Sequence, residues 1–237
     1  MRVDNQSAFV LHSRPYRDNK ELIELFTADY GKIGCVASIP RGKRRRISGK
    51  PQAFSKLSVS LFGKGELKTA RSIEVDGPTY LLQGNNLLSG FYLNELLLRL
   101  LPKEDDASIL FQVYETTLQL LCDSPNIEPI LREFEKKLLS ELGYGLTLDC
   151  DAATGEALEL AADYMFRPEF GLKRIYTYGR PVNSLNHFTG AVLQAIDQNN
   201  YENTEVRRSA KKLMRMAIDA LLGGKPLQSR ELFRPSK

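Results

Sequence analysis

The first 80 residues of the chain contain short runs in which apolar and polar residues alternate, as they do in β-strands with one buried face. In the run KLSVSLFGKG, the apolar residues Leu57, Val59 and Leu61 lie on one face of the expected strand, and serines occupy the other. Further β-rich runs are AFVLHSRPY, GKIGCVASIPR and ELKTARSIEVDG. The segment RDNKELIELFTADYG fits either a helix or a strand. Five short strands joined by turns predict a small β-barrel.

The pattern changes at residue 86, from which point apolar residues recur with the period of an α-helix. The segment NNLLSGFYLNELLLRLLP is apolar on nearly every side, which predicts a helix at the centre of its domain. Helical spacing also marks DASILFQVYETTLQLLCD, IEPILREFEKKLLSELGYG, TGAVLQAIDQ and NTEVRRSAKKLMRMAIDALLGG. We therefore expect an α+β multidomain protein, with an OB-fold β-barrel at 1–80 and an all-helical domain at 81–237 that contains an irregular segment at 144–188.

The cysteines and the apolar stretches narrow the class of protein. Cys35, Cys122 and Cys150 are widely spaced, which favours neither a disulfide framework nor a structural zinc site, so we expect no metal and no cofactor. The richest apolar stretch, LNELLLRLLP, is far shorter than the ~20 residues that span a bilayer. The amino terminus lacks the pattern of a secretory signal. We expect a soluble cytoplasmic protein that does not contact membranes.

Catalytic motifs are missing from the sequence, which contains no P-loop, GxSxG, HExxH or GxGxxG pattern. The two histidines, His12 and His187, lie in unrelated contexts. We therefore predict no catalytic residue. The absence of a motif does not exclude an enzyme, and an enzyme that processes nucleic acid, with its site in 144–188, stays open as an alternative.

Positive charge is concentrated at the start of the chain. Residues 1–80 contain 15 Lys or Arg and 8 Asp or Glu, a net of +7, whereas residues 81–237 contain 18 and 21, a net of −3. The segment SIPRGKRRRISGK brings together six cations and no acid, at Arg41, Lys43, Arg44, Arg45, Arg46 and Lys50. Such a run between two strands of a barrel is typical of a loop that binds nucleic-acid phosphates. A solubilising surface loop is the other interpretation.

Further cations extend this predicted DNA-binding surface. On the barrel they are Arg14, Lys56 and Arg71, with Arg17, Lys64 and Lys68 nearby, and on the last helix they are Arg208, Lys211, Lys212 and Arg215. The helical set fits either a second phosphate-contacting strip or a solvated face. Tyr16, Phe54 and Phe62 are candidates for base stacking or for the core. If all the cations only solvate the surface, the chain is a protein-only adaptor.

The segment ILREFEKKLLSELGYG carries a second set of cations. Arg132 and Lys136 are four residues apart and share a helix face, whereas leucines face elsewhere. Interleaved acids make a salt-bridged surface helix one interpretation. The other is an apolar notch with a basic rim, which would bind the acidic end of a peptide through an arginine–carboxylate pair.

Several of these motifs together resemble the RecO family of DNA-repair proteins, in its proteobacterial branch. They are AFVLHSRPY, FTADYGK, the basic loop, GELKTARSIE, LLSGFYLNELLLRLL, LREFEKKLLSELGYG and GGKPLQSRELF, and they follow one another in the family's order over almost the whole chain. The resemblance implies an OB-fold followed by a helical domain. Many relatives carry a four-cysteine zinc module after LGYG, where this chain keeps only Cys150, so packing is expected to replace the metal.

The resemblance also implies function and partners. It implies binding of single- and double-stranded DNA, annealing of complementary strands and, with RecR, help in loading RecA onto DNA coated by single-stranded-DNA-binding protein. It further implies capture of that protein's acidic carboxy-terminal tail, a role carried over to Leu131, Arg132, Glu135, Lys136 and Leu139 because LREFE matches the family there. The implied protein is a nucleoid-associated monomer and not an enzyme.

Overall fold

The computed structural model describes residues 2–17, 19–38, 52–176 and 186–233. These residues form two compact units. The first, called the barrel unit here, comprises Met1–Pro125 together with Leu227–Lys237, and the second unit comprises Asn126–Pro226.

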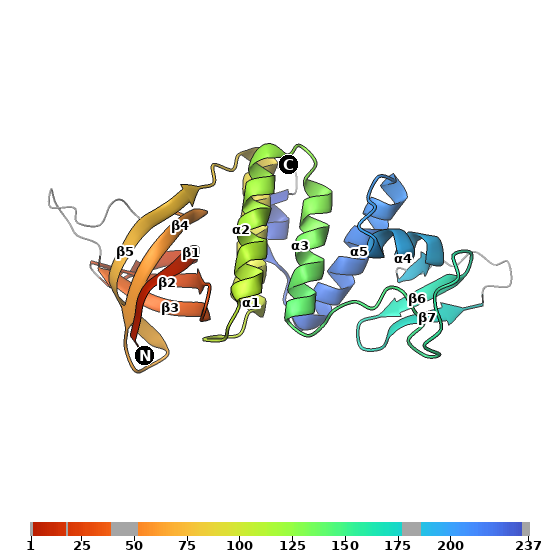
Figure 1. Cartoon of the computed structure of the whole chain (residues 1–237), viewed down its shortest axis with the longest axis horizontal. Coiled ribbons are helices and arrows are strands. Elements are labelled where there is room, and N and C mark those ends of the chain that lie inside the picture. The colour runs from red at the N-terminus through yellow and green to blue at the C-terminus, as the bar shows by residue number, and fades with distance from the viewer. Residues whose placement is uncertain (1, 18, 39–51, 177–185, 234–237) are drawn as a thin grey trace. The chain divides into compact units, whose positions relative to one another are not determined.

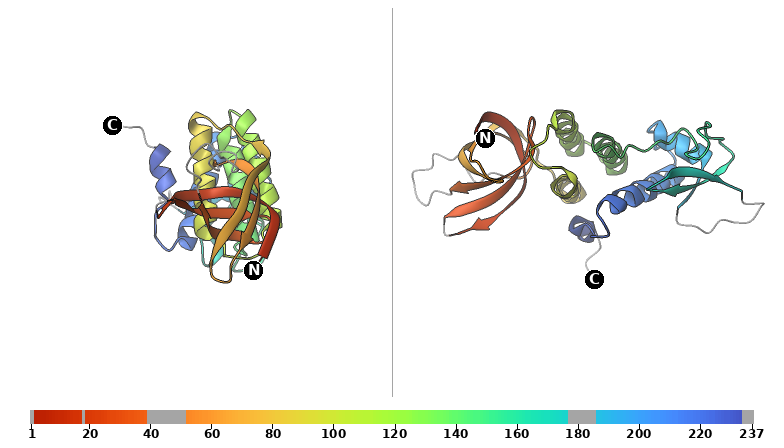
Figure 2. Two further views of the ribbon diagram at one scale, coloured as in Figure 1. Left: turned by 90° about the vertical axis from the view of Figure 1, so that its left-hand side faces the viewer. Right: turned by 90° about the horizontal axis from the view of Figure 1, so that it is seen from below.

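A closed barrel of five strands dominates the barrel unit (Figures 1 and 2). The strands are β1 (Arg2–Tyr16), β2 (Lys20–Thr27), β3 (Gly31–Ser38), β4 (Ser55–Phe62) and β5 (Leu67–Thr79). They follow one another around the barrel in the order β1-β2-β3-β5-β4, with β3 and β5 parallel and the other neighbours antiparallel. The segment that fitted either a helix or a strand is therefore strand β2 with its flanking turns.

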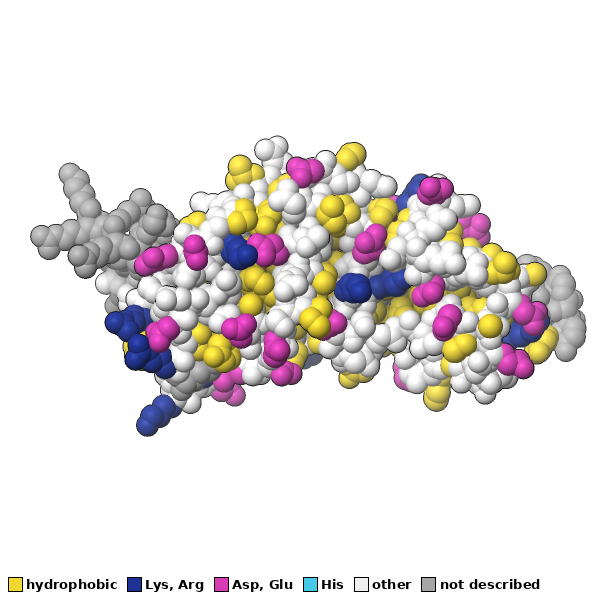
Figure 3. Space-filling model, viewed as in Figure 1, with side chains coloured by type: hydrophobic (Ala, Val, Ile, Leu, Met, Phe, Trp, Pro, Cys, Tyr) yellow, Lys and Arg dark blue, Asp and Glu magenta, His cyan; other side chains and the backbone are white. Residues whose placement is uncertain are grey.

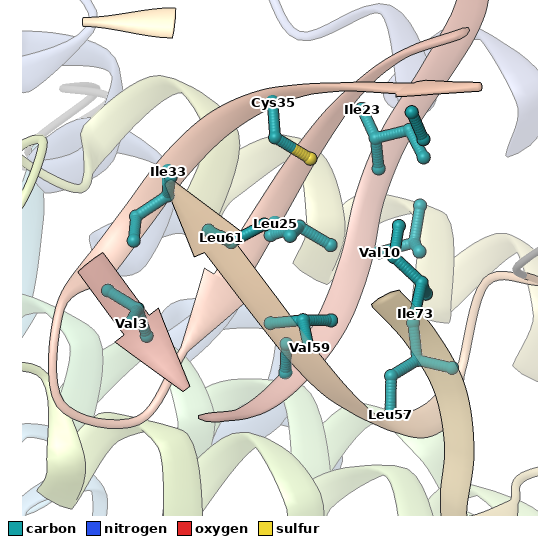
Figure 4. Packing of buried hydrophobic residues seen from close by; sticks show 12 residues of the cluster. Val3, Val10, Ile23, Leu25, Ile33, Cys35, Leu57, Val59, Leu61 and Ile73 are labelled. Carbon is teal, nitrogen blue, oxygen red and sulfur yellow. The ribbon is translucent and has the colours of Figure 1, made fainter. Parts of the chain in front are cut away.

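The alternation in the sequence places one face of each strand inside the barrel. Leu57, Val59 and Leu61 of β4 are buried there, as predicted, against Ile23 and Leu25 of β2 (Figure 4). Fully burying an aliphatic side chain of this size contributes roughly 1.5–3 kcal/mol. The barrel interior is thus filled by side chains, and any ligand must bind to its outside or its ends.

Two helices, α1 (Gly84–Leu100) and α2 (Ser108–Asp123), cover part of the outer surface of the barrel. The rings of Phe9 and Phe26 pack on Phe111 and Tyr114 of α2, with centroids 5.2–5.8 Å apart. Asn94 of α1 completes the contact, because its amide donates to the carbonyls of β1 at 3.2 and 3.3 Å and its oxygen accepts from the Tyr114 hydroxyl at 2.5 Å. The helices are held by packing and by a satisfied polar network.

The turn between β2 and β3 meets the loop that joins α1 to α2. Gly31 has φ of 53°, and a β-carbon added to it would collide with the backbone carbonyl of Asp105. Gly34, on the same strand, has room, since an added β-carbon would lie 3.4 Å from the flexible carboxylate of Glu24. Gly31 therefore allows both the left-handed turn and the close approach of the two backbones.

Replacing Gly31 by alanine is expected to lower the free energy of unfolding by about 2–4 kcal/mol, from left-handed strain together with the collision. Gly34→Ala is the matched control and is expected to change it by less than about 1 kcal/mol. Urea denaturation followed by circular dichroism measures both. Equal midpoints for the two variants would show that the approach at Gly31 is not tight.

The carboxy-terminal segment returns to the barrel unit as a short 3₁₀ helix, η1 (Gln228–Phe233), on α1. The carboxylate of Glu95 accepts the backbone N–H groups of Gln228 and Ser229 at 2.9 and 2.8 Å, and the Ser229 hydroxyl at 2.6 Å. Burial opposes ionisation of this carboxylate, but the three hydrogen bonds prevail and hold the pKa of Glu95 below its usual value. Glu95 thus caps the amino end of η1 from another helix.

The second unit contains the helices α3 (Ile127–Glu141), α4 (Gly190–Asp197) and α5 (Thr204–Leu221). It also contains a sheet in the order β7-β6-β8, formed by β6 (Asp163–Arg167), β7 (Gly171–Ile175) and β8 (His187–Thr189), and α4 and α5 lie on one side of it (Figure 1). The predicted fold class, a barrel followed by helices, is confirmed. The sheet was not expected in a domain predicted to be all-helical, and it lies almost wholly in the irregular segment at 144–188. Its strands of three to five residues are too short to show a period in the sequence.

Within the described parts of the chain, no helix is both long and apolar enough to span a bilayer.

Candidate nucleic-acid interface

The six cations of the basic loop, Arg41, Lys43, Arg44, Arg45, Arg46 and Lys50, lie outside the described residues. The strands on either side show where the loop joins the barrel. Strand β3 ends at Ser38, which pairs with Lys20 at the start of β2. Ser38, the last described residue before the basic segment, therefore lies beside the hairpin that joins β1 to β2.

That hairpin carries its own exposed cations, Arg14, Arg17 and Lys20. Tyr16 pairs with Lys20 across the hairpin, and the Arg17 guanidinium lies 5.3 Å from the centroid of the Tyr16 ring. None of the three cations forms an ion pair with another described residue. Sequence reasoning selected Arg14 but missed Lys20. Lys20 lies in this hairpin only because residues 20–27 form a strand, which the sequence pattern left undecided.

Two cations predicted for this surface instead tie the barrel to the helices. The Lys56 ammonium is half-buried and lies 2.8 and 2.9 Å from the two carboxylate oxygens of Glu115 on α2. Lys68 is only 4% exposed and lies 2.6 Å from the Glu104 carboxylate. Both charges are already neutralised within the barrel unit, so the structure gives Lys56 and Lys68 a structural role and does not present them to a ligand.

The remaining barrel candidates are exposed to different degrees. Arg71 stands exposed on β5, and Figure 3 shows Lys and Arg side chains gathered on part of the barrel in that view. Among the aromatic candidates, Phe54 is buried with its ring 5.4 Å from that of Phe91, so it belongs to the core. Phe62 is 50% exposed and Tyr16 is partly exposed. Of the three rings, these last two can meet a base.

The cations of α5 belong to the second unit. Arg208, Lys211 and Arg215 are exposed, and the Lys211 ammonium lies 3.7 Å from the Glu128 carboxylate. Lys212 differs, because its ammonium lies 4.1 Å from the centroid of the Phe188 ring and donates to the carbonyl of His187 at 2.8 Å. Burial lowers the pKa of Lys212. Lys212 therefore fastens α5 to strand β8. Lys211 is exposed but faces Glu128, and Arg208 and Arg215 are exposed.

The residues predicted to capture an acidic tail lie in the interior of the second unit. Arg132 is 6% exposed and Glu135 is 1% exposed, and the Arg132 Nη2 atom donates to the Glu135 Oε1 atom at 2.8 Å. Leu131 and Leu139 are also buried. Two buried donors of Arg132, Nε and Nη1, have no hydrogen-bond partner among the described residues. The helix thus presents no open notch in this conformation, but it holds an arginine with unused donors.

Lys136, the fifth residue of that set, closes the end of another helix. Its ammonium donates to the carbonyls of Ile196 and Asp197 at 3.0 and 2.8 Å and to the Asn199 side chain at 2.8 Å. A cation at this position satisfies the last carbonyls of α4 and complements the helix dipole. Burial lowers the pKa of Lys136, and the Asp197 carboxylate opposes that shift. The lysine is therefore engaged within the unit.

The loop that follows Cys150 is organised by a buried carboxylate. The Asp151 Oδ1 atom accepts the backbone N–H groups of Ala153 and Thr154 at 2.7 and 3.3 Å, and its Oδ2 atom accepts that of Arg174 at 2.7 Å. Burial opposes ionisation, but these hydrogen bonds hold the pKa of Asp151 below its usual value. No group of three or more potential metal ligands occurs among the described residues. Asp151 links the loop to β7.

Comparison with known proteins identifies the family. A model described as Recombination protein O N terminal matches residues 1–78, and one described as Recombination protein O C terminal matches residues 81–231. The DNA repair protein RecO of Cellvibrio japonicus (strain Ueda107) is 44% identical over 240 residues, covering 99% of this chain and 98% of that protein. DNA repair protein RecO of Stutzerimonas stutzeri (strain A1501) is 43% identical over 229 residues, covering 97% and 93%. The chain belongs to the RecO family of DNA repair proteins.

Proposed function

We propose that the chain is a recombination mediator that binds single- and double-stranded DNA and anneals complementary strands. With RecR, it would help to load RecA onto DNA coated by single-stranded-DNA-binding protein. The observation that carries the proposal is the hairpin of Arg14, Arg17 and Lys20, whose charges no described residue neutralises, beside Ser38, the last described residue before the basic segment. The protein would act as a monomer in the cytoplasm, at the nucleoid.

The proposed mechanism is electrostatic and involves no covalent step. Lysine and arginine side chains neutralise phosphates and release condensed counterions, which favours binding to any sequence. Two backbones held on one cationic surface repel each other less and meet at a high effective concentration, so that base pairing is accelerated by proximity. Arg71 and the exposed cations of α5, Arg208, Lys211 and Arg215, would contact further phosphates. The protein is therefore proposed not to be an enzyme.

Capture of the acidic tail of single-stranded-DNA-binding protein is the second part of the proposal. It is supported by Arg132, whose Nε and Nη1 donors are buried and find no partner in the described part of the chain. A carboxylate is the acceptor that such donors favour, since arginine–carboxylate hydrogen bonds are among the stronger ones in proteins. Because Leu131 and Leu139 are buried on the same helix, the tail would reach this arginine only when α3 and its neighbours separate locally.

A salt titration of binding to single-stranded DNA tests the proposal. For bare DNA, log Kd is expected to rise linearly with log salt concentration, with a slope of about 0.7 for each phosphate contacted. The same titration on coated DNA is expected to retain a salt-independent part, from the tail. Absence of binding in dilute buffer would refute the proposal, and so would cleavage or modification of the DNA, which would favour the enzyme alternative.

A further inference from the structure

The outer face of the β6–β7 hairpin in the second unit borders a cavity of about 540 Å³. Met165 of β6 and Ile175 of β7 form an apolar floor, and Arg167, Lys173 and Phe170 also line the cavity. Two small residues, Ala152 and Ala153, line it from the loop that Asp151 organises. The function proposed above does not use this face.

Alternation along the two strands separates this face from the core. Tyr164, Phe166 and Leu172 point the other way and are at most 2% exposed. The residues between them, Arg167 and Lys173 among them, must therefore point outward. A sheet whose buried side is already filled presents this cationic and apolar side to a ligand.

The like charges of Arg167 and Lys173 are close enough to repel each other. Met165 pairs with Lys173 and Arg167 pairs with Gly171, which makes Arg167 and Lys173 diagonal neighbours on one face. Such neighbours lie about 7–8 Å apart, near enough for like charges to repel and for one anion to contact both. Neither forms an ion pair with any residue of the described ranges.

The nearby carboxylates contact other groups, and Asp151 acts on Lys173 only through its charge, without a direct contact. Both oxygens of Asp151 already accept backbone N–H groups, and the Asp163 carboxylate lies 2.7 Å from a ring nitrogen of His187. The Glu159 carboxylate pairs with Arg174. Glu169, in the turn between the strands, is exposed and is the acid that remains. Arg167 and Lys173 therefore keep donors that no carboxylate of the described residues contacts, and one anion could accept hydrogen bonds from both.

The exposed aromatic ring of Phe170 indicates which kind of anion could bind in this cavity. Its side chain is 72% exposed, next to an apolar floor, which leaves a planar ring open to stacking. The backbone donors beside it are used within the unit: Ala152 donates to Leu172, Ala153 to Asp151, and Phe170 to Arg167. A peptide carboxylate would find few free N–H groups here. A ring, a flat apolar floor and two cations match the base and phosphate of a nucleotide.

We propose that the outer face of the β6–β7 hairpin is a second site for single-stranded nucleic acid, holding one or two nucleotides, with a base on Phe170 and a phosphate between Arg167 and Lys173. This inference rests on the proposed function, because it assumes that the chain binds DNA. It goes further by giving the second unit a place for a stacked base, in addition to the phosphate contacts proposed for α5.

The test uses the full chain and a single-stranded oligothymidylate of about 20 nucleotides with 5-iodouracil at several positions, cross-linked by ultraviolet light. Peptide mass spectrometry is expected to find adducts on Phe170. Phe170→Ala is expected to abolish them and to weaken binding about 5- to 10-fold, as loss of one stacked base does. Tyr144→Ala is the matched control, since Tyr144 is 59% exposed in the same unit and does not line the cavity.

A double variant tests the charges. Arg167→Glu with Lys173→Glu is expected to reduce the slope of log Kd against log salt by up to about 1.4, or 0.7 for each phosphate that is no longer neutralised. Lys137→Glu with Lys225→Glu, exposed positions of the second unit away from the cavity, should leave the slope unchanged. The four replaced side chains lie at the surface of the unit, so thermal unfolding should not shift.

The outcomes separate this inference from the proposed function. Adducts confined to residues 1–125, with equal affinities for Phe170→Ala and Tyr144→Ala, would overturn the inference and leave the proposed function intact. Loss of binding of a labelled acidic peptide in Phe170→Ala, with DNA binding unchanged, would overturn it in favour of a peptide site. Failure of the wild-type chain to bind the oligonucleotide at all would overturn both.

Discussion

Replacement of Arg44, Arg45 and Arg46 by glutamate is expected to weaken binding of single-stranded DNA about 50-fold or more at 0.15 M salt. Removing three cations that neutralise phosphates lowers the slope of log Kd against log salt by about 2.1. If the two proteins bind equally at 1 M salt, this smaller slope alone leaves the variant about 50-fold weaker than the wild type at 0.15 M salt. The reversed charges would also repel the strand from the hairpin of Arg14, Arg17 and Lys20. Fluorescence anisotropy of a labelled oligonucleotide across a salt series measures both the affinity and the slope.

Two controls separate charge on the loop from charge in general. Lysine at the same three positions keeps the charge and is expected to keep the affinity within about threefold, since phosphate neutralisation depends mainly on charge. Glutamate at Lys103, Lys137 and Lys225, exposed positions outside the barrel strands, changes the net charge equally and should have a small effect. If this second triple variant loses as much affinity as the first, the loop is not the binding element.

Replacement of Arg132 by alanine is expected to destabilise the second unit by about 3–5 kcal/mol, because it removes the cation with which the buried Glu135 carboxylate pairs. Hydrogen exchange in α3, followed by mass spectrometry, measures the loss of local stability. The same variant is expected to lose binding of an acidic peptide with a free carboxyl terminus while DNA binding persists. Unfolding alone could produce that loss, so this variant by itself does not test the tail site.

A paired replacement resolves the ambiguity. Arg132→Met together with Glu135→Leu removes both charges and keeps the volume, a change that is often close to neutral for stability or favourable. The double variant should therefore protect α3 from exchange as well as the wild type does, and yet fail to bind the acidic peptide. Wild-type peptide affinity in the folded double variant would remove Arg132 from the proposed tail site.

The barrel could be predicted because most of its strands have one buried face. Leu57, Val59 and Leu61 alternate with smaller polar residues, and the structure confirms that they face inward. Strand β2 was ambiguous for a physical reason: Leu25 points into the barrel while the neighbouring Phe26 is buried on its outside against Phe111. A strand covered on both sides loses its alternation and reads equally well as a helix.

Whether a given cation is exposed or paired with a carboxylate was much harder to predict than the number of cations. Lys56 and Lys68 look like Arg14 and Arg71 in the sequence, but they find carboxylates on elements tens of residues away. Only the fold brings Glu115 and Glu104 to them. Glu135, by contrast, is three residues from Arg132 and visible as a helical neighbour, but the burial of that pair depends on packing that no local pattern reveals.

Because Glu95 holds η1 on α1, the last segment of the chain belongs to the same unit as the first 125 residues. The chain passes from the barrel unit into the second unit between residues 125 and 126 and returns between 226 and 227, so the second unit is an insertion with two covalent crossings. Cutting one crossing would leave the halves joined through the other. A chain cut short after residue 226 would lose the piece that rests on α1, so trimming the carboxyl end would damage the part of the protein that begins at the amino end.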